Sequence, residues 1–246
     1  MTANKYRDRI YGSYVSSQET VTGLPTAQNR FAPRAALLYG VIDEHFPRDL
    51  EAKILDLGCG HGALLWFAQA KGFRNTKGID VSLEQVELAE QLGVHNVVQG
   101  DIGSALSTEP KEQLDVVVMF DVLEHFTRDE LIVVMDGVFR VLKPGGRLIA
   151  HVPNGASPFV GRIRYGDFTH ELAFTRTSLR QLALSSGFSR VDCFEDNPFS
   201  KSIRGVLRSS LWRFFRSLMR LYLAAETGDI HRDGIFTQNL LAVVYK

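Results

Sequence analysis

Short apolar runs rich in β-branched residues alternate with longer segments of helical periodicity from residue 53 onward. The runs predict strands over 53–57, 75–80, 96–100, 114–120 and 146–152. Between them, apolar side chains recur every three or four residues over 61–71, 83–92 and 128–141. Such spacing is typical of helices that pack on a sheet. The alternation therefore predicts a doubly wound α/β fold with a parallel sheet.

Two local signals agree with this pattern. Ser82, followed three residues later by Gln85, is typical of a capping box at the start of the second helix. Pro144-Gly145-Gly146 is expected to end the third helix near Leu142 and to turn the chain into the fifth strand.

The alternation becomes less regular after residue 152. A loop over 153–174, a helix over 177–187, a strand over 191–194 and a long helical segment follow in that order. Residues 237–245 then form a last apolar strand without an adjoining crossover helix. We therefore expect this strand to run antiparallel to the others.

Composition fits a single globular domain. The 246 residues are 45% apolar and 23% charged, and 28 basic residues balance 28 acidic ones. A chain without net charge has no overall attraction to nucleic acid, so we expect no nucleic-acid partner. The two cysteines, Cys59 and Cys193, lack the spacing of a zinc site, and no signal peptide or membrane span is visible. These features predict a cytoplasmic protein.

A glycine-rich turn joins the first strand to the first helix. Gly58, Gly60 and Gly62 follow Leu57 and precede a helix that begins near Ala63. Glycines permit positive φ and close approach of a ligand, and the helix N-terminus presents free N–H groups, so a nucleotide-type cofactor is expected here. The run also satisfies the pattern G-x-G-x-x-A, which leaves a dinucleotide open.

Acidic residues at the ends of three strands favour a different cofactor. Asp56, two residues before the first glycine, suits the ammonium and sulfonium of S-adenosylmethionine better than a pyrophosphate. Asp80 is placed to accept from ribose hydroxyls, and Asp101 from an adenine amino group. The predicted cofactor contacts are Asp56, Gly58, Cys59, Gly60, Asp80, Val81, Asp101, Ile102 and Phe120.

Several segments together resemble class I S-adenosylmethionine-dependent methyltransferases. They are Asp56 to Gly62, Asp80, Asp101, Asp121-Val122-Leu123-Glu124-His125 and Leu142-Lys143-Pro144-Gly145-Gly146. The resemblance covers residues 53–152 and implies a Rossmann-like sheet of seven strands, mostly parallel, with the last strand antiparallel. We expect one domain, with a cofactor-binding core over 51–195 and 236–246, a helical lid over 1–50 and a helical insertion over 196–235.

The turn after the fourth strand bears on the acceptor atom. Nitrogen and DNA-base methyltransferases typically carry an Asp/Asn-Pro-Pro-aromatic run there, whereas this chain has Phe120-Asp121-Val122-Leu123. An oxygen acceptor is therefore favoured. Since a hydroxyl must lose its proton during transfer, histidines and carboxylates near the cofactor become catalytic candidates.

Asp121, Glu124 and His125 stand at positions i, i+3 and i+4, so one helical turn would present all three to the cleft. Similar residues in ubiquinone-type O-methyltransferases are taken as a magnesium site. A metal site at these residues is therefore one interpretation, and helix capping with lining of the cofactor site is the other.

The loop after the fifth strand holds a second candidate site. The run from Tyr165 to Phe174, followed by Ser178-Leu179, is similar to O-methyltransferases of bacterial polysaccharide biosynthesis, which modify sugar hydroxyls. A neutral His170 oriented by Asp167 would be the general base, with His125 as a further catalytic candidate. The alternative is that Asp167 and His170 order the loop through hydrogen bonds.

Residues 201–222 predict a basic amphipathic helix. An apolar stripe from Ile203 to Tyr222 repeats at helical spacing, and most cations fall on the opposite side. The cations are Lys201, Arg204, Arg208, Arg213, Arg216 and Arg220, with no acid among them. The helix is expected either to pack its stripe on the domain or to contact an anionic membrane or a lipid pyrophosphate.

These features predict an S-adenosylmethionine-dependent O-methyltransferase of polysaccharide biosynthesis. Its expected acceptor is a sugar hydroxyl of a nucleotide-linked or lipid-linked bacterial glycan, and its expected place is the cytoplasm or the inner membrane face. Two alternatives stay open: a magnesium-assisted O-methyltransferase of a small aromatic or quinone hydroxyl, and a noncatalytic module that only binds the cofactor.

Overall fold

A computed structural model describes residues 5–11, 26–196, 203–228 and 234–246. They contain a seven-stranded sheet with the order β3-β2-β1-β4-β5-β7-β6. The strands are β1 (Lys53–Leu57), β2 (Asn75–Asp80), β3 (Val97–Gln99), β4 (Leu114–Phe120), β5 (Leu142–Pro153), β6 (Arg190–Glu195) and β7 (Asn239–Tyr245). The first five strands pair in parallel, and β7 pairs antiparallel with both β5 and β6. The predicted fold, including the reversed last strand, is confirmed.

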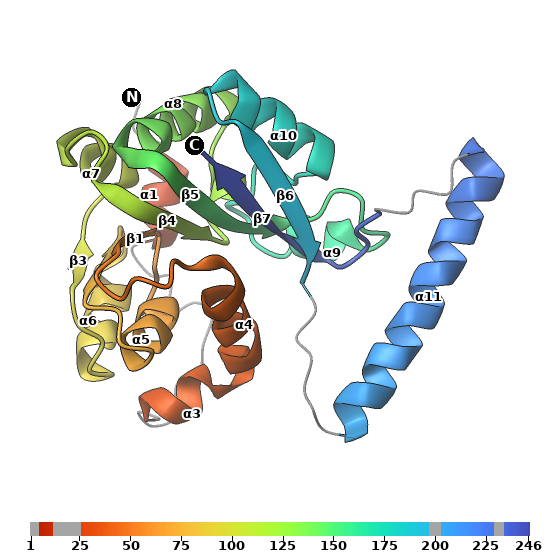
Figure 1. The fold of residues 1–246 in the computed structure, drawn as a ribbon, viewed down its shortest axis with the longest axis horizontal. Coiled ribbons are helices and arrows are strands. Elements are labelled where there is room, and N and C mark those ends of the chain that lie inside the picture. Colours follow the sequence, from red (N-terminus) through yellow and green to blue (C-terminus); the bar gives the residue numbers. More distant parts are fainter. Residues whose placement is uncertain (1–4, 12–25, 197–202, 229–233) are drawn as a thin grey trace.

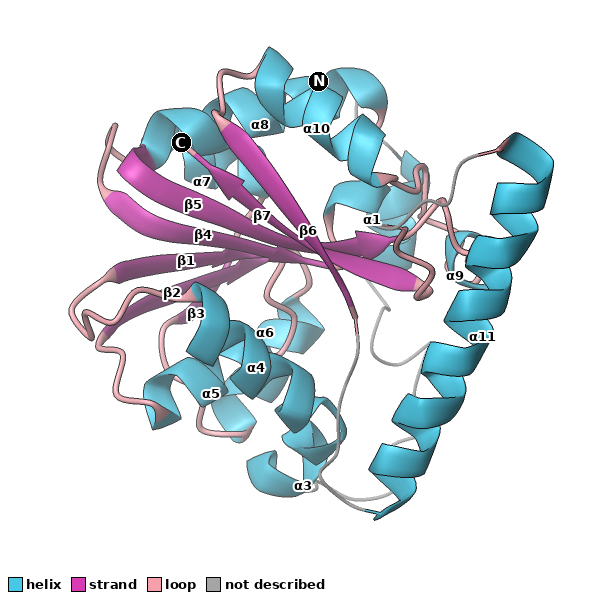
Figure 2. Cartoon of the chain, turned by 45° about the vertical axis from the view of Figure 1, so that its right-hand side comes forward, coloured by secondary structure: helices cyan, strands magenta, loops and turns pink. Residues whose placement is uncertain are grey.

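Helices cover both faces of the sheet (Figure 1, Figure 2). One face carries α4 (Ala35–His45), α5 (Ala63–Ala70) and α6 (Leu83–Gln91), and the other carries α7 (Ile102–Thr108), α8 (Arg128–Val141) and α10 (Arg176–Ser185). Successive strand residues point to opposite faces, so Val116 and Val118 enter one core while Val117 and Met119 enter the other. Because both sets are apolar, both faces must be covered.

Shorter elements stand at the ends of the strands or away from the sheet. They are α1 (Lys5–Tyr11), α3 (Ala27–Phe31), η1 (Ala32–Arg34), η2 (Leu123–His125), α9 (Val160–Arg164) and the long α11 (Ile203–Thr227). Helix α11 connects β6 to β7 in the chain and stands beside the domain rather than on a face of the sheet (Figure 1).

Two local expectations are corrected. The capping box at Ser82 is wrong: the hydroxyl of Ser82 makes no capping bond, and Gln85 Oε1 lies 3.0 Å from His61 Nδ1 at the glycine turn. The fifth strand begins at Leu142 rather than at 146. Pro144-Gly145-Gly146 therefore lies inside β5, in an irregularity between the pairs Leu114–Leu142 and Val116–Arg147.

The tight packing around Gly62 in the glycine turn predicts how substitutions there change the free energy of unfolding. Gly62→Ala should lower the free energy of unfolding by about 2–4 kcal/mol, because φ is +78° and a Cβ would lie 2.7 Å from Val94 Cγ1. Gly93→Ala is the matched control, since φ is +73° but no atom lies within 4 Å of the added Cβ. It should cost about 1–2 kcal/mol in urea denaturation. Equal losses for the two variants would contradict the tight contact with Val94.

Candidate cofactor and catalytic site

A cleft of about 860 Å³ lies at the carboxyl ends of the central strands. Its volume falls within the range of small-molecule sites. All nine residues expected to contact the cofactor line it, namely Asp56, Gly58, Cys59, Gly60, Asp80, Val81, Asp101, Ile102 and Phe120. The tertiary structure therefore brings the whole predicted set together.

The glycine turn is held against the neighbouring strand. The backbone N–H groups of Gly58 and Cys59 donate to Ile79 O at 2.7 and 3.1 Å. A Cβ on Gly58, where φ is +71°, would lie 2.5 Å from Val122 Cγ2. Only glycine allows this close approach, which leaves the N-terminus of α5 open to the cleft.

Asp56 is a buried acid in the wall of the cleft. Its side-chain atom Oδ1 has no hydrogen-bond partner among the described residues, and only 2% of the residue is exposed. Burial, and then the nearby charge of Asp80, raise the pKa of Asp56 to about 7, although Arg34 opposes the shift. A buried acceptor without a partner is costly unless a ligand satisfies it, so Asp56 fits a cationic group such as an ammonium.

The other two strand-end acids also order the backbone. Asp80 Oδ2 accepts from the N–H of Gly60 at 2.7 Å, and Asp80 Oδ1 accepts from that of Ser82 at 2.9 Å. Asp101 Oδ1 accepts from Ser104 N at 3.1 Å and so caps α7, a structural function that was not predicted. Both carboxylates line the cleft, where their remaining lone pairs can accept from ribose or adenine groups.

Asp121 lies at the end of β4 with an unusual φ of +58°. Its carboxylate is paired with His151 of β5 and lies 2.9 Å from Arg34 Nη2. Burial opposes a charged His151, but Asp121 and Asp196 outweigh it and raise the pKa of His151 to about 10. Burial also favours a neutral Asp121, but His151 and Arg34 outweigh it and hold the pKa of Asp121 well below its usual range.

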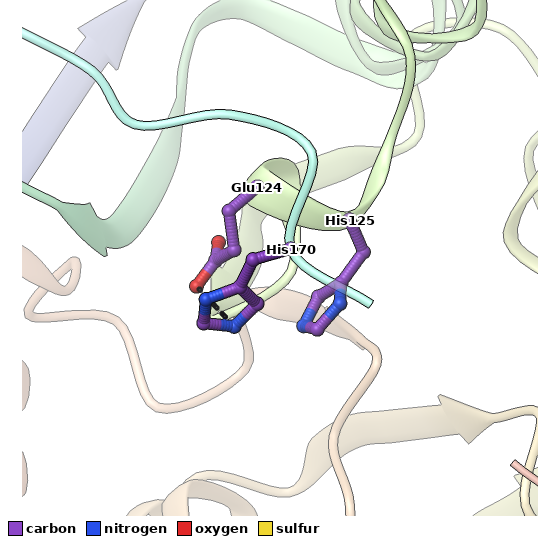
Figure 3. A group of neighbouring side chains, drawn as sticks. All are labelled: Glu124, His125 and His170. Atoms are coloured by element: carbon purple, nitrogen blue, oxygen red, sulfur yellow. Dashed lines mark ion pairs between the residues drawn. The ribbon is translucent and has the colours of Figure 1, made fainter. Parts of the chain in front are cut away.

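The expectation that one helical turn presents Asp121, Glu124 and His125 together is wrong. Asp121 precedes the 3-10 helix η2 and turns toward His151, whereas the buried Glu124 faces the loop that carries His170. Glu124, His125 and His170 instead form a group that could hold a metal ion among the described residues (Figure 3). One ligand atom of each lies within 4.8 Å of the others.

The expected orientation of His170 by Asp167 is also wrong. Asp167 Oδ1 accepts from Thr169 N at 2.8 Å and from Thr169 Oγ1 at 2.6 Å, so its side chain orders the loop. His170 Nδ1 lies 3.0 Å from Ile163 O. A carbonyl can only accept, so Nδ1 carries the hydrogen and the lone pair of a neutral His170 is on Nε2, 3.9 Å from Glu124 Oε1.

Asp167 instead orients His125, through Thr169. His125 Nδ1 lies 2.9 Å from Thr169 Oγ1, and that hydroxyl already donates its hydrogen to Asp167. His125 Nδ1 must therefore be the donor, which leaves the lone pair of the ring on Nε2. Burial, and then His170, lower the pKa of His125 to about 4, so the ring is neutral at physiological pH. His125 lines the cleft, and the fully buried Thr169 is a positioning residue that the sequence reasoning missed.

The N-terminal helices supply further lining residues that were not predicted. Arg7, Tyr11, Arg30 and Arg34 line the cleft. Helix α1 is anchored by an ion pair of 2.9 Å between Arg7 Nη1 and Glu130 Oε2, and by a hydrogen bond from Tyr6 to Glu171. Burial raises the pKa of Tyr11 to about 12, and its ring lies edge-on to His125 with a centroid distance of 6.3 Å. The sequence contains no signal that these four N-terminal residues line the cleft, because they lie far from the glycine turn along the chain.

Comparison with known proteins agrees with this architecture. A family described as "Methyltransferase domain" matches residues 29–192. The chain is 32% identical over 149 residues to ajmaline N-methyltransferase of Rauvolfia serpentina, covering 54% of this chain and 50% of that protein. It is 33% identical over 100 residues to the ubiquinone biosynthesis O-methyltransferase of Pseudomonas fluorescens, covering 39% and 42%. The chain therefore matches about half the length, or less, of these curated relatives.

Solved structures share the fold at lower identity. A SAM-dependent methyltransferase of Archaeoglobus fulgidus superposes with a TM-score of 0.63 at 19% identity, covering 89% of this chain and 97% of that one. A SAM-dependent methyltransferase of Thermotoga maritima gives 0.61 at 17% identity, covering 97% and 98%. The chain belongs to the methyltransferase-domain family, and the cofactor that its fold implies is S-adenosylmethionine.

Proposed function

We propose that the protein is an S-adenosylmethionine-dependent O-methyltransferase that acts on a sugar hydroxyl of a bacterial glycan. The observation that carries this proposal is the presence, in one cleft, of two groups, Asp56 and His125. Asp56 is a buried acid whose Oδ1 has no partner among the described residues, and His125 is a neutral imidazole. The carboxylate suits a cationic methyl donor, and the imidazole suits an acceptor that must lose a proton.

The loop after β5 supports a sugar acceptor. Phe159, Tyr165 and Phe168 are exposed by 69%, 80% and 84% of their surface, in the same loop that carries His170. Large exposed aromatic groups near a cleft commonly mark a recognition surface, and aromatic faces stack well on the C–H faces of sugars. The likeness of this loop to polysaccharide O-methyltransferases stays a prediction.

The cofactor supplies an electrophilic methyl group when it is bound. In the cleft, Asp56 would hold its ammonium, Asp80 its ribose and Asp101 its adenine. These contacts would orient the methyl donor, and the residues of the N-terminal helices that line the cleft would limit access of water. Positioning is the main contribution that a protein makes to an in-line displacement.

We assign His125 as the general base that removes the proton of the acceptor hydroxyl. Its ring lines the cleft and is neutral, and the Asp167–Thr169 pair keeps its lone pair on Nε2. His170, the base expected from the sequence, lies behind it with a centroid distance of 4.7 Å between the rings. In this scheme Thr169 and Asp167 are positioning residues, and burial and then the adjacent His170 lower the pKa of His125.

A metal-assisted reaction is the second candidate, and the convergence of Glu124, His125 and His170 favours it. Burial, and then the charge of Asp121, raise the pKa of Glu124 well above its usual range, and Glu124 Oε2 has no partner among the described residues. Two imidazoles and a carboxylate suit a divalent transition ion better than magnesium, which prefers oxygen ligands. The alternative acceptor is then a small aromatic or quinone hydroxyl, a class that includes the substrates of ubiquinone biosynthesis.

Asp56→Asn should weaken binding of S-adenosylmethionine at least about tenfold at pH 8, because it removes the charge opposite the ammonium. Since the pKa of Asp56 is about 7, wild-type affinity should rise between about pH 6 and pH 8 as the carboxylate ionises, whereas the variant should lack this rise. Isothermal titration calorimetry measures both effects. Asp136→Asn, on the exposed side of α8, is the control. Equal affinity of all three proteins at pH 8 would rule out the contact.

His125→Ala should lower kcat about 10²–10⁴-fold, the usual contribution of a general base, while cofactor affinity stays unchanged. Thr169→Val keeps the shape of a fully buried side chain. It should lower kcat less than His125→Ala does, and it should shift the pH profile of kcat. The assay follows labelled methyl transfer to polysaccharide from a deletion strain, with mass spectrometry of the product. If His170→Ala costs more kcat than His125→Ala, then His170 is the base. If the wild-type protein binds the cofactor but shows no turnover, the result would support the noncatalytic module.

Prolonged dialysis against EDTA separates the two enzyme candidates. Under the primary proposal, turnover and the thermal midpoint are unchanged by the treatment. The metal-assisted reaction would instead be established if EDTA lowers both turnover and the thermal midpoint and if zinc, manganese or magnesium restores them. Elemental analysis should then find bound metal in the wild type and none in Glu124→Gln.

A further inference from the structure

Helix α11 leaves a continuous apolar stripe in solvent. None of its 25 residues is buried. The exposed large apolar side chains are Ile203, Val206, Leu207, Leu211, Phe214, Phe215, Leu218, Leu221 and Tyr222, and Ile203 is 90% exposed. The apolar stripe, defined as these residues, is larger than the surface that monomeric proteins usually leave in water.

The helix is turned with the side opposite the apolar stripe toward the domain. Arg216 Nη1 lies 2.7 Å from Glu195 Oε2 of β6, and Trp212 Nε1 donates to the same oxygen at 3.4 Å. At about 100° per residue, these two side chains lie on the opposite side of the helix from Leu211, Phe214 and Leu218. The interpretation that the stripe packs on the domain is therefore wrong, because this ion pair holds the stripe outward.

Charge decides between possible occupants of the stripe. The helix carries Arg204, Arg208, Arg213, Arg216 and Arg220, and its only acid is Glu226 near the C-terminal end. Arg204, Arg208 and Arg213 are exposed. At about 100° per residue, Arg208 and Arg213 flank the stripe, and Arg204 lies within it at the N-terminal end of the helix. A second copy of the helix would set arginine against arginine, whereas lipid phosphates complement them.

We propose that α11 is an interfacial anchor that lies flat on an anionic bilayer. The stripe enters the acyl boundary, and Arg204, Arg208 and Arg213 reach the lipid phosphates. Flat binding agrees with the composition of the helix, since no described helix combines the length and the apolar character that crossing a bilayer requires.

The same geometry favours an acceptor attached to a lipid. Helix α9, which begins the loop of His170, lies on the side of the domain that faces α11 (Figure 1, Figure 2). Membrane binding would therefore bring the acceptor loop close to the headgroups. This extension to a lipid-linked glycan rests on the proposed function, whereas the anchor itself does not.

Sedimentation of the full chain with vesicles tests the anchor. The protein should bind vesicles of phosphatidylcholine with about one third phosphatidylglycerol, bind pure phosphatidylcholine far less, and be released by high salt. Leu211→Ser with Phe214→Ser, and separately Arg204→Glu with Arg208→Glu, should each reduce the bound fraction at least about tenfold. The matched control, on the exposed side of α10, is Arg180→Glu with Leu184→Ser, which should bind like the wild type.

Three results would overturn the anchor: no binding by the wild type, equal binding to both vesicle types, or equal loss in the α10 control. Light scattering without vesicles adds a fourth, a dimer that Leu211→Ser with Phe214→Ser dissociates, which would make the stripe an interface between copies. S-adenosylmethionine affinity, measured on the same variants, should stay unchanged. Failure of the anchor is thus distinguishable from failure of the proposed function.

Discussion

The charge of Asp121 is shared between His151 and Arg34, and the arrangement of the cleft depends on this sharing. The three side chains come from the end of β4, from β5 and from the N-terminal helices, so the charges join the sheet to the helices above it. Among the three, His151 is buried, and a buried charge is tolerated only when its partner is present, so loss of Asp121 would leave His151 without its main partner. The positive φ at Asp121 is the local cost of pointing its carboxylate at both partners.

This pairing also divides the acids of the cleft by task. Asp121 is paired with His151 and Arg34, whereas Oδ1 of the buried Asp56 has no partner among the described residues, as the proposed contact with a cationic group would require. Beyond Asp121 the chain turns into η2, which sends Glu124 toward His170 and leaves His125 at the cleft. In the proposed function, cofactor binding and proton removal therefore fall to neighbouring but separate groups.

Helix α11 shows the same principle on the surface. Glu195 of β6 accepts from both Trp212 and Arg216, and these two contacts lie on the side of the helix that meets the domain. The hydrophobic effect would by itself turn the apolar stripe inward. The observed orientation instead exposes the stripe, which leaves it free to contact the acyl chains of a bilayer as proposed above.

The sequence by itself determined the strand and helix order, the glycine turn and a set of nine residues that line one cleft. Those features follow from periodicity, from backbone freedom at glycine and from the rule that the carboxyl ends of parallel strands meet at one edge, all of which are local or general. Only the tertiary structure decided the partner of Asp167, the separation of Asp121 from Glu124 and the outward face of α11. Each depends on a hydrogen bond or ion pair whose partner lies outside the local pattern, such as Arg34 and Asp121, 87 residues apart. Sequence spacing can place a side chain on one face of a helix or strand, but its hydrogen-bond or ion-pair partner depends on how the elements pack together.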